Sequence, residues 1–180
     1  MFTMSTYHHG DLPAALLRAA GQTLEKKGIG ALSLREAARR AGVSHNAPYR
    51  HFPDREALLA ALAAEGFAML GERLRAYTGR EMGEAYVRFA LEQPQRFRLM
   101  FGGVLPMAKY PELRSAADGA YQALVSAFKD LPRPQLAAAA AWSLVHGLSH
   151  LLLDGQFAHA EPEAFVREVI GAVRFAQRAA

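Results

Sequence analysis

The sequence has no cysteine, one tryptophan and no sustained alternation of apolar and polar residues. The absence of cysteine excludes a disulfide framework and thiolate metal ligands, and it is compatible with a reducing compartment. The absence of alternation argues against a β-sheet. Residues 1–12 lack the basic flank and apolar run of a signal peptide. Hydrophobic residues make up 51% and charged residues 21%, which is typical of globular proteins. We therefore expect an all-α protein in the cytoplasm.

Positive charge is concentrated at the N-terminal end. Residues 1–55 hold eight Lys or Arg against four Asp or Glu, whereas the remaining residues hold thirteen of each. All of the formal net charge of +4 therefore lies in the first third of the chain. A basic module on a neutral body is the distribution that attraction to phosphate groups requires.

Residues 33–55 carry the signals of two short helices joined by a glycine. Ser33 precedes Glu36 by three residues, which predicts a capping box in which Glu36 reaches back to Ser33. Gly42 is the residue that ends such a helix at least cost. Ser44 is then available as the N-cap of a second helix. The spacing predicts a helix-turn-helix.

The second helix of a helix-turn-helix places its N-terminal residues at base edges in the major groove. Asn46 has the amide that pairs with adenine, and the Ala47 methyl suits a thymine methyl. The polar residues that follow are suited to phosphate oxygens. The alternative is an ordinary helical corner with a solvated basic face. The candidate DNA-binding residues are Ser33, Arg35, Ser44, His45, Asn46, Ala47, Tyr49, Arg50, His51 and Arg55.

Several of these residues fall in a recognisable order: Ala41-Gly42-Val43-Ser44, then Tyr49-x-His51-Phe52, then Arg55-x-x-Leu58. This order, with Tyr7 to Leu12 before it, resembles the DNA-binding domain of the TetR family of bacterial repressors. Two positions depart from the family pattern, Ala37 and Pro48, where a bulkier aliphatic residue and a Leu or Ile are usual. Because proline lacks an amide and crowds the carbonyl of Ser44, we expect a short or distorted recognition helix.

The resemblance implies a three-helix head joined by a long fourth helix to a helical body. Accordingly, we expect a DNA-binding domain over 1–53 and an effector-binding and dimerisation domain over 54–180. Caps, breakers and apolar spacing predict the helices themselves. The expected helices are 11–27, the two segments within 33–55, 54–77, 81–93, 94–101, 111–129, 136–153 and 162–177.

Residues 136–153 contain no charged side chain, which reaches the length of a membrane span. We favour a buried helix instead, since the segment is only weakly apolar and lacks anchoring flanks. In the resembled family the last two helices pair with those of a second subunit in a four-helix bundle. Small residues at Ala139, Ser143 and Gly147 would allow close approach. We therefore expect a homodimer and no membrane partner.

Trp142, His146 and Gly147 resemble the Trp-His-Gly signature of one class of TetR C-terminal domain. His146 and His150 are four residues apart and lie on one helix face, but Gly147 stands where a zinc protease has glutamate. We expect no metal and no cofactor. Two alternatives remain: a core tryptophan with hydrogen-bonded histidines, or a pocket in which Trp142 stacks on a ligand that His146 orients.

Methionine and aromatic residues elsewhere suit the wall of a mostly apolar pocket, although core residues have the same composition. The candidate ligand-binding residues are Phe67, Leu70, Met100, Phe101, Met107, Tyr121, Trp142 and His146. The leading hypothesis is a dimeric regulator that binds a near-palindromic double-stranded operator and is released by a small molecule. The alternatives are an architectural DNA-binding protein without an effector, and a helical enzyme using His146 or His150 as a base. No nucleophile or acid pair at a suitable spacing supports an enzyme.

Overall fold

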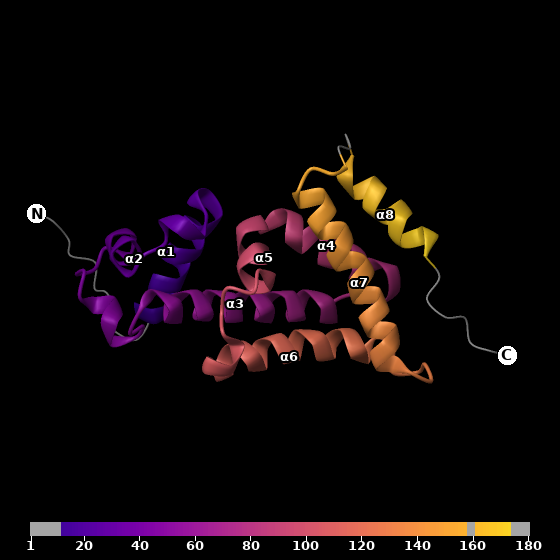
Figure 1. Ribbon diagram of the computed structural model, residues 1–180, viewed down its shortest axis with the longest axis horizontal. Helices are drawn as coiled ribbons and strands as arrows, with labels where there is room; N and C mark the ends of the chain where they lie inside the picture. The colour runs from indigo at the N-terminus through magenta and orange to yellow at the C-terminus, as the bar shows by residue number, and fades with distance from the viewer. Residues whose placement is uncertain (1–11, 158–160, 174–180) are drawn as a thin grey trace, which may run out of the picture. The chain divides into compact units, whose positions relative to one another are not determined.

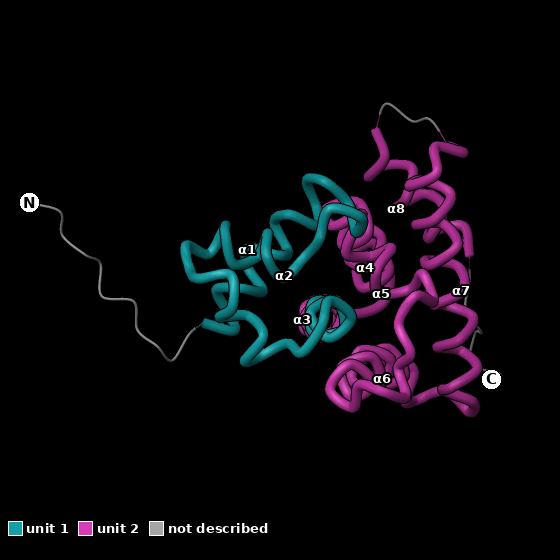
Figure 2. The backbone as a smooth tube through the Cα atoms, turned by 60° about the vertical axis from the view of Figure 1, so that its left-hand side comes forward, with its two compact units in different colours: residues 1–62 teal, residues 63–180 magenta. Residues whose placement is uncertain are grey.

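The computed structural model describes residues 12–157 and 161–173, and every regular element within them is helical. The predicted all-α class is confirmed. The chain forms two compact units, residues 1–62 and residues 63–180 (Figure 2), and helix α3 contributes to both. The elements are α1 (Leu12–Lys27), η1 (Ile29–Ala31), α2 (Leu34–Ala41), η2 (Ala47–Arg50), α3 (Arg55–Arg75), α4 (Gly79–Glu92), α5 (Pro94–Phe101), η3 (Met107–Lys109), α6 (Pro111–Ser126), α7 (Pro134–Leu153) and α8 (Pro162–Ala172).

The first unit, here called the head, is built on the packing of α1 against α2. Both helices have apolar residues at helical spacing, so each offers one stripe to a common core. Thr23 lies inside this core, where its hydroxyl donates to the carbonyl of Ala19 at 2.9 Å. The fully or almost fully buried apolar residues include Leu16, Ala20, Leu24, Leu32, Leu34, Ala38, Phe52 and Leu58.

The second unit, here called the body, has α4 in its interior. Helix α4 packs against α5, α7 and α8, and α6 packs against α7. Helix α6 also runs along the C-terminal part of α3 (Figure 1), where Gly71 faces the backbone of Ala120. A β-carbon at Gly71 would lie 3.3 Å from the Ala120 α-carbon, so glycine permits this close approach of the two helices.

Several helix ends differ from the sequence-based prediction. Helix α4 begins at Gly79, two residues before the predicted start, since Gly79 adopts a left-handed φ of 56° that turns the chain after α3. Helix α7 begins at Pro134 because proline is favoured in the first turn. Helix α6 ends at Ser126 rather than 129, and α8 ends at Ala172. The predicted cap at Asp11 and the predicted helical residues 174–177 lie outside the described residues.

Helix α7 is long and apolar enough to cross a membrane by length and composition alone, with a mean hydropathy of 1.5. In the structure it packs against α4 and α6. Its buried residues include Ala138, Val145 and Leu148. The helix is therefore part of the folded body, although only 28% of its most apolar 18-residue window is buried there.

Candidate DNA interface and ligand cavity

Ser33 is the N-cap of α2, the first helix of the helix-turn-helix. Of the two hydrogen bonds in the predicted capping box, the structure has one. The Ser33 hydroxyl accepts from the Glu36 amide at 3.1 Å. The prediction that Glu36 reaches back to Ser33 is wrong, because its carboxylate accepts hydrogen bonds from Arg39 and Arg40 at 2.8–2.9 Å. These hydrogen bonds lower the pKa of Glu36 to about 2, so its carboxylate stays ionised and neutralises part of the basic surface.

The turn is a left-handed glycine turn, as the sequence indicates. Gly42 has φ of 70°, and its amide donates to the carbonyls of Ala38 and Arg39. The Val43 amide donates to the Ala38 carbonyl at 3.1 Å. This pattern satisfies the last carbonyls of α2 and directs the chain away from it.

The second segment is a short 3-10 helix, η2, and not an α-helix. The predicted N-cap at Ser44 is wrong: the cap position is Asn46, which makes no side-chain capping hydrogen bond. Pro48 has no amide to donate to the Ser44 carbonyl, and that carbonyl instead accepts from Ala47 at 3.0 Å. The ring of Pro48 is fully buried, so the residue that shortens the helix also anchors it to the head.

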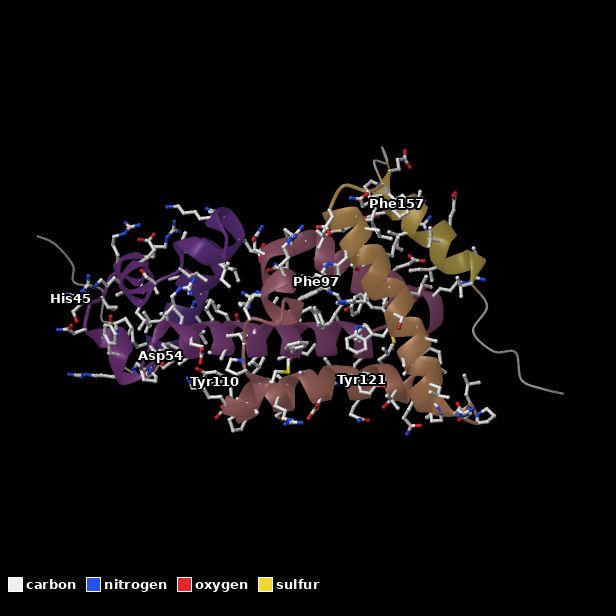
Figure 3. All side chains as sticks on the ribbon, viewed as in Figure 1. His45, Asp54, Phe97, Tyr110, Tyr121 and Phe157 are labelled. Atoms are coloured by element: carbon white, nitrogen blue, oxygen red, sulfur yellow. The ribbon has the colours of Figure 1, made fainter. Side chains whose placement is uncertain are left out.

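Polar side chains of this segment point outward. Tyr49 is 49% exposed, and His45 stands at the surface of the head (Figure 3). Ser33 and Ala47 are half-buried. The remaining candidates are all exposed: Arg35, Ser44, His45, Asn46, Arg50, His51 and Arg55. The structure thus presents a surface rich in hydrogen-bond donors, and the DNA-binding roles of these residues stay predictions.

Arg55 has a second role that its sequence position does not reveal. Its Nε donates to the Leu32 carbonyl at 2.8 Å, and its Nη2 donates to the Ile29 carbonyl. The guanidinium therefore ties the first turn of α3 to η1. The predicted phosphate contact and these internal hydrogen bonds would use the same guanidinium group. Loss of Arg55 should therefore affect both the stability of the head and its positive charge.

The variant Arg55→Ala is expected to lower the free energy of unfolding of the head by about 2 kcal/mol, because it removes two charge-assisted hydrogen bonds. Urea unfolding followed by circular dichroism measures this loss. Arg50→Ala is the matched control, since Arg50 is exposed and its truncation should change stability by about 0.5 kcal/mol or less. Equal stability of the two variants would contradict the structural role of Arg55.

The body contains a cavity of about 300 Å³ that gathers residues from five helices and η3. Six of the eight predicted ligand-binding residues line it. Met100 does not, and its sulfur packs against Gly66 instead. His146 does not line it either, because Tyr86 takes the place predicted for it. The lining residues are Phe67, Leu70, Leu74, Tyr86, Phe101, Met107, Ala117, Asp118, Ala120, Tyr121, Leu124 and Trp142.

A hydrogen-bonded chain crosses the wall of this cavity. The Trp142 indole N–H donates to the Tyr86 hydroxyl oxygen at 3.0 Å, and that hydroxyl lies 2.9 Å from His146 Nδ1. Burial raises the pKa of Tyr86, so its hydroxyl stays protonated. Burial, followed by the nearby His150, lowers the pKa of His146, which favours the neutral imidazole. The tautomer of His146 then decides which of the two groups donates the proton of this hydrogen bond.

A second cavity, of about 480 Å³, adjoins the first one. Three residues belong to the walls of both cavities: Leu74, Tyr86 and Leu124. We call these three side chains, which the two cavities share, the partition. The rest of the second cavity is lined by Gly79, Arg80, Met82, Gly83, Ala127, Phe128, Ala141, Leu144, Val145, Ile170 and Val173.

Residues 16–62 match the family model of bacterial regulatory proteins of the tetR family. Residues 79–173, more than half of the chain, match the model of the tetracyclin repressor-like C-terminal domain. The chain belongs to the TetR family. It is thus a DNA-binding transcriptional regulator, and the match over 79–173 includes the Trp142 to Gly147 segment that suggested this kind of C-terminal domain.

Solved structures share the fold of this chain. A protein of unknown function from Rhodococcus sp. RHA1 is 34% identical, with 94% of each chain covered and a TM-score of 0.78. A TetR-family regulatory protein from Rhodococcus RHA1 is 19% identical over 93% of this chain and 100% of that chain, with a TM-score of 0.67. The multidrug binding protein EbrR complexed with imidazole is 23% identical over 99% and 97%, with a TM-score of 0.64. The comparison with curated proteins gave no match.

Proposed function

We propose that the chain is a cytoplasmic homodimeric repressor that leaves its operator when a small molecule fills the cavity beside Trp142. The observation that carries this proposal is the coexistence of an exposed, donor-rich helix-turn-helix with an aromatic cavity in the body. The cavity has the size expected of small-molecule sites, which start at about 300 Å³. A ligand that prefers one arrangement of the two heads would change operator affinity by its coupling free energy, typically about 1–3 kcal/mol.

Dimerisation through α7 and α8 is supported by apolar side chains that the single chain leaves exposed. Leu136 is 54% exposed and Leu151 is 42% exposed, both on α7. Val173, directly after α8, is 38% exposed. A second copy that covers these side chains would place two heads on half-sites about 34–36 Å apart. The operator should then be near-palindromic.

The alternatives have less support. An architectural DNA-binding protein has no use for the cavity. A helical enzyme would use His146 or His150 as a base, but no nucleophile or acid pair stands at a suitable spacing in the sequence to act with it. The described residues hold no group of three or more His, Cys, Asp or Glu arranged for a metal ion.

Selection of bound duplexes from a random pool tests the DNA-binding part. The intact chain is expected to select a near-palindromic sequence. Asn46→Ala should relax the preference at one base position in each half-site, with a loss of about 1–3 kcal/mol there. Arg50→Ala should weaken binding to all duplexes and reduce the salt-dependence slope by about 1 for each phosphate that the arginine neutralises in the parent.

The two variants control for each other, because one is expected to change sequence preference and the other only the overall affinity. Failure to enrich any sequence would remove the main support for a sequence-specific regulator. Enrichment of a single half-site without a palindrome would speak against the dimer.

A further inference from the structure

The side chains that line the 300 Å³ cavity beside Trp142 include one charged group, a carboxylate. Asp118, on α6, is the single charged residue among those that line the cavity. Its side chain is exposed, so it stands at the cavity mouth, and the described residues form no ion pair with it. Arg75 binds α6 one residue further on, through the Gly119 carbonyl at 3.3 Å, and does not line the cavity.

Five of the twelve residues that line the cavity are aromatic. Trp142 lies 5.8 Å from the Tyr121 ring and 6.2 Å from the Phe101 ring, measured between centroids. Phe67 meets Phe101 edge to face at 5.2 Å. Tyr121, labelled in Figure 3, extends from the same helix as Asp118. Ring faces carry partial negative charge and attract cations.

The hydrogen-bond donors of the wall are largely committed inside the protein. The Trp142 N–H donates to the Tyr86 hydroxyl oxygen, and the same hydroxyl is hydrogen-bonded to His146 Nδ1. An anionic ligand would therefore meet no positive side chain in the cavity, few available donors, and the repulsion of Asp118. A cation would instead be attracted by the aromatic rings of the wall and by the carboxylate of Asp118 at the mouth.

From this arrangement we propose that the effector is a lipophilic organic cation, with an aromatic or aliphatic body seated against Trp142, Phe101 and Phe67 and its positive group near Asp118. This inference rests on the proposed function, in that it names the chemical class of the molecule that acts at the cavity. It follows from the charge and ring geometry of this chain alone.

Binding to the cavity can be followed by intrinsic fluorescence, because Trp142 is the one tryptophan of the chain and lines the cavity. Three probes of matched shape separate the possible ligand classes: the cation phenylbutyl-trimethylammonium, its neutral isostere with a quaternary carbon in place of nitrogen, and the anion phenylpentanoate. Titration of the full-length protein should quench or shift the Trp142 emission. The cation is expected to bind about tenfold more tightly than the isostere, and the anion more weakly than both.

Asp118→Asn should weaken binding of the cation about fivefold and leave the isostere unchanged, since it removes a solvent-exposed charge. Asp130→Asn is the matched control: Asp130 is also exposed and does not line the cavity, so it should bind all three probes like the parent. Circular dichroism spectra of both variants verify that they are folded.

Three results would overturn the proposal. The first is equal or tighter binding of the isostere or the anion. The second is equal cation affinity in the Asp118 and Asp130 variants. The third is no binding of the cation by fluorescence or by equilibrium dialysis. None of these results affects the operator selection, which contains no ligand, so a failure of the ligand class is distinguishable from a failure of the proposed regulator.

Discussion

Phe97→Ala is expected to lower the free energy of unfolding of the body by about 3–5 kcal/mol, the cost of truncating a buried phenylalanine. Phe97, on α5 (Figure 3), is fully buried. Its ring lies 4.9 Å from Phe101 and 6.0 Å from Tyr86. It also lies 5.4 Å from each of His146 and His150. No single neighbour fills the space that the ring would vacate, so a cavity term adds to the lost burial.

The measurement is urea unfolding followed by Trp142 fluorescence, which reports on the body. Phe157→Ala is the matched control, because it removes the same atoms from a ring that is 40% exposed and should cost about 1 kcal/mol or less. If both variants lose the same stability, Phe97 is not the packing centre of the body.

Tyr86→Phe is expected to lower the free energy of unfolding by about 1–3 kcal/mol, although it removes one oxygen atom. The Trp142 N–H and His146 Nδ1 both lose their hydrogen-bond partner. A buried polar group without a partner lowers stability, because the free energy of removing it from water is no longer offset by a hydrogen bond. The ring itself and its packing are retained. The loss therefore measures the hydrogen-bonded chain and not the shape of the core.

Urea unfolding measures this change too, and a shift in Trp142 emission should accompany it, since the indole N–H changes its environment. Tyr77→Phe makes the identical chemical change at a side chain that is 39% exposed, and its stability should match the parent. A Tyr86 variant as stable as the Tyr77 variant would show that water replaces the lost hydroxyl without cost.

Local signals predicted most of the helices. Ser33 and Gly42 marked the limits of α2 because capping depends on residues next to each other in the chain. The same holds for prolines such as Pro94 and Pro111, which stand at the first position of their helices. Ends without such a signal, as at Ser126, were predicted less accurately, because a helix without a strong breaker ends where tertiary packing stops supporting it.

The candidate site was harder to predict, since it depends on contacts between distant residues. The role of Arg55 comes from carbonyls 23 and 26 residues before it, and no local pattern marks such a contact. Tyr86 hydrogen-bonds to residues 56 and 60 positions away. Met100 and Phe101 are adjacent on one helix, yet only Phe101 lines the cavity, and no local pattern distinguishes the two.

The partition formed by Leu74, Tyr86 and Leu124 has a consequence for molecular size. A molecule that fits within the 300 Å³ cavity leaves the partition intact. A longer molecule that enters the neighbouring 480 Å³ cavity has to pass the partition, and displacement of the Tyr86 ring would break its hydrogen bonds to Trp142 and His146. A longer molecule that extends through the mouth beside Asp118 leaves these bonds intact. Affinity within a homologous series of ligands should therefore fall abruptly at one chain length if the added atoms enter the second cavity, and stay level if they extend into solvent.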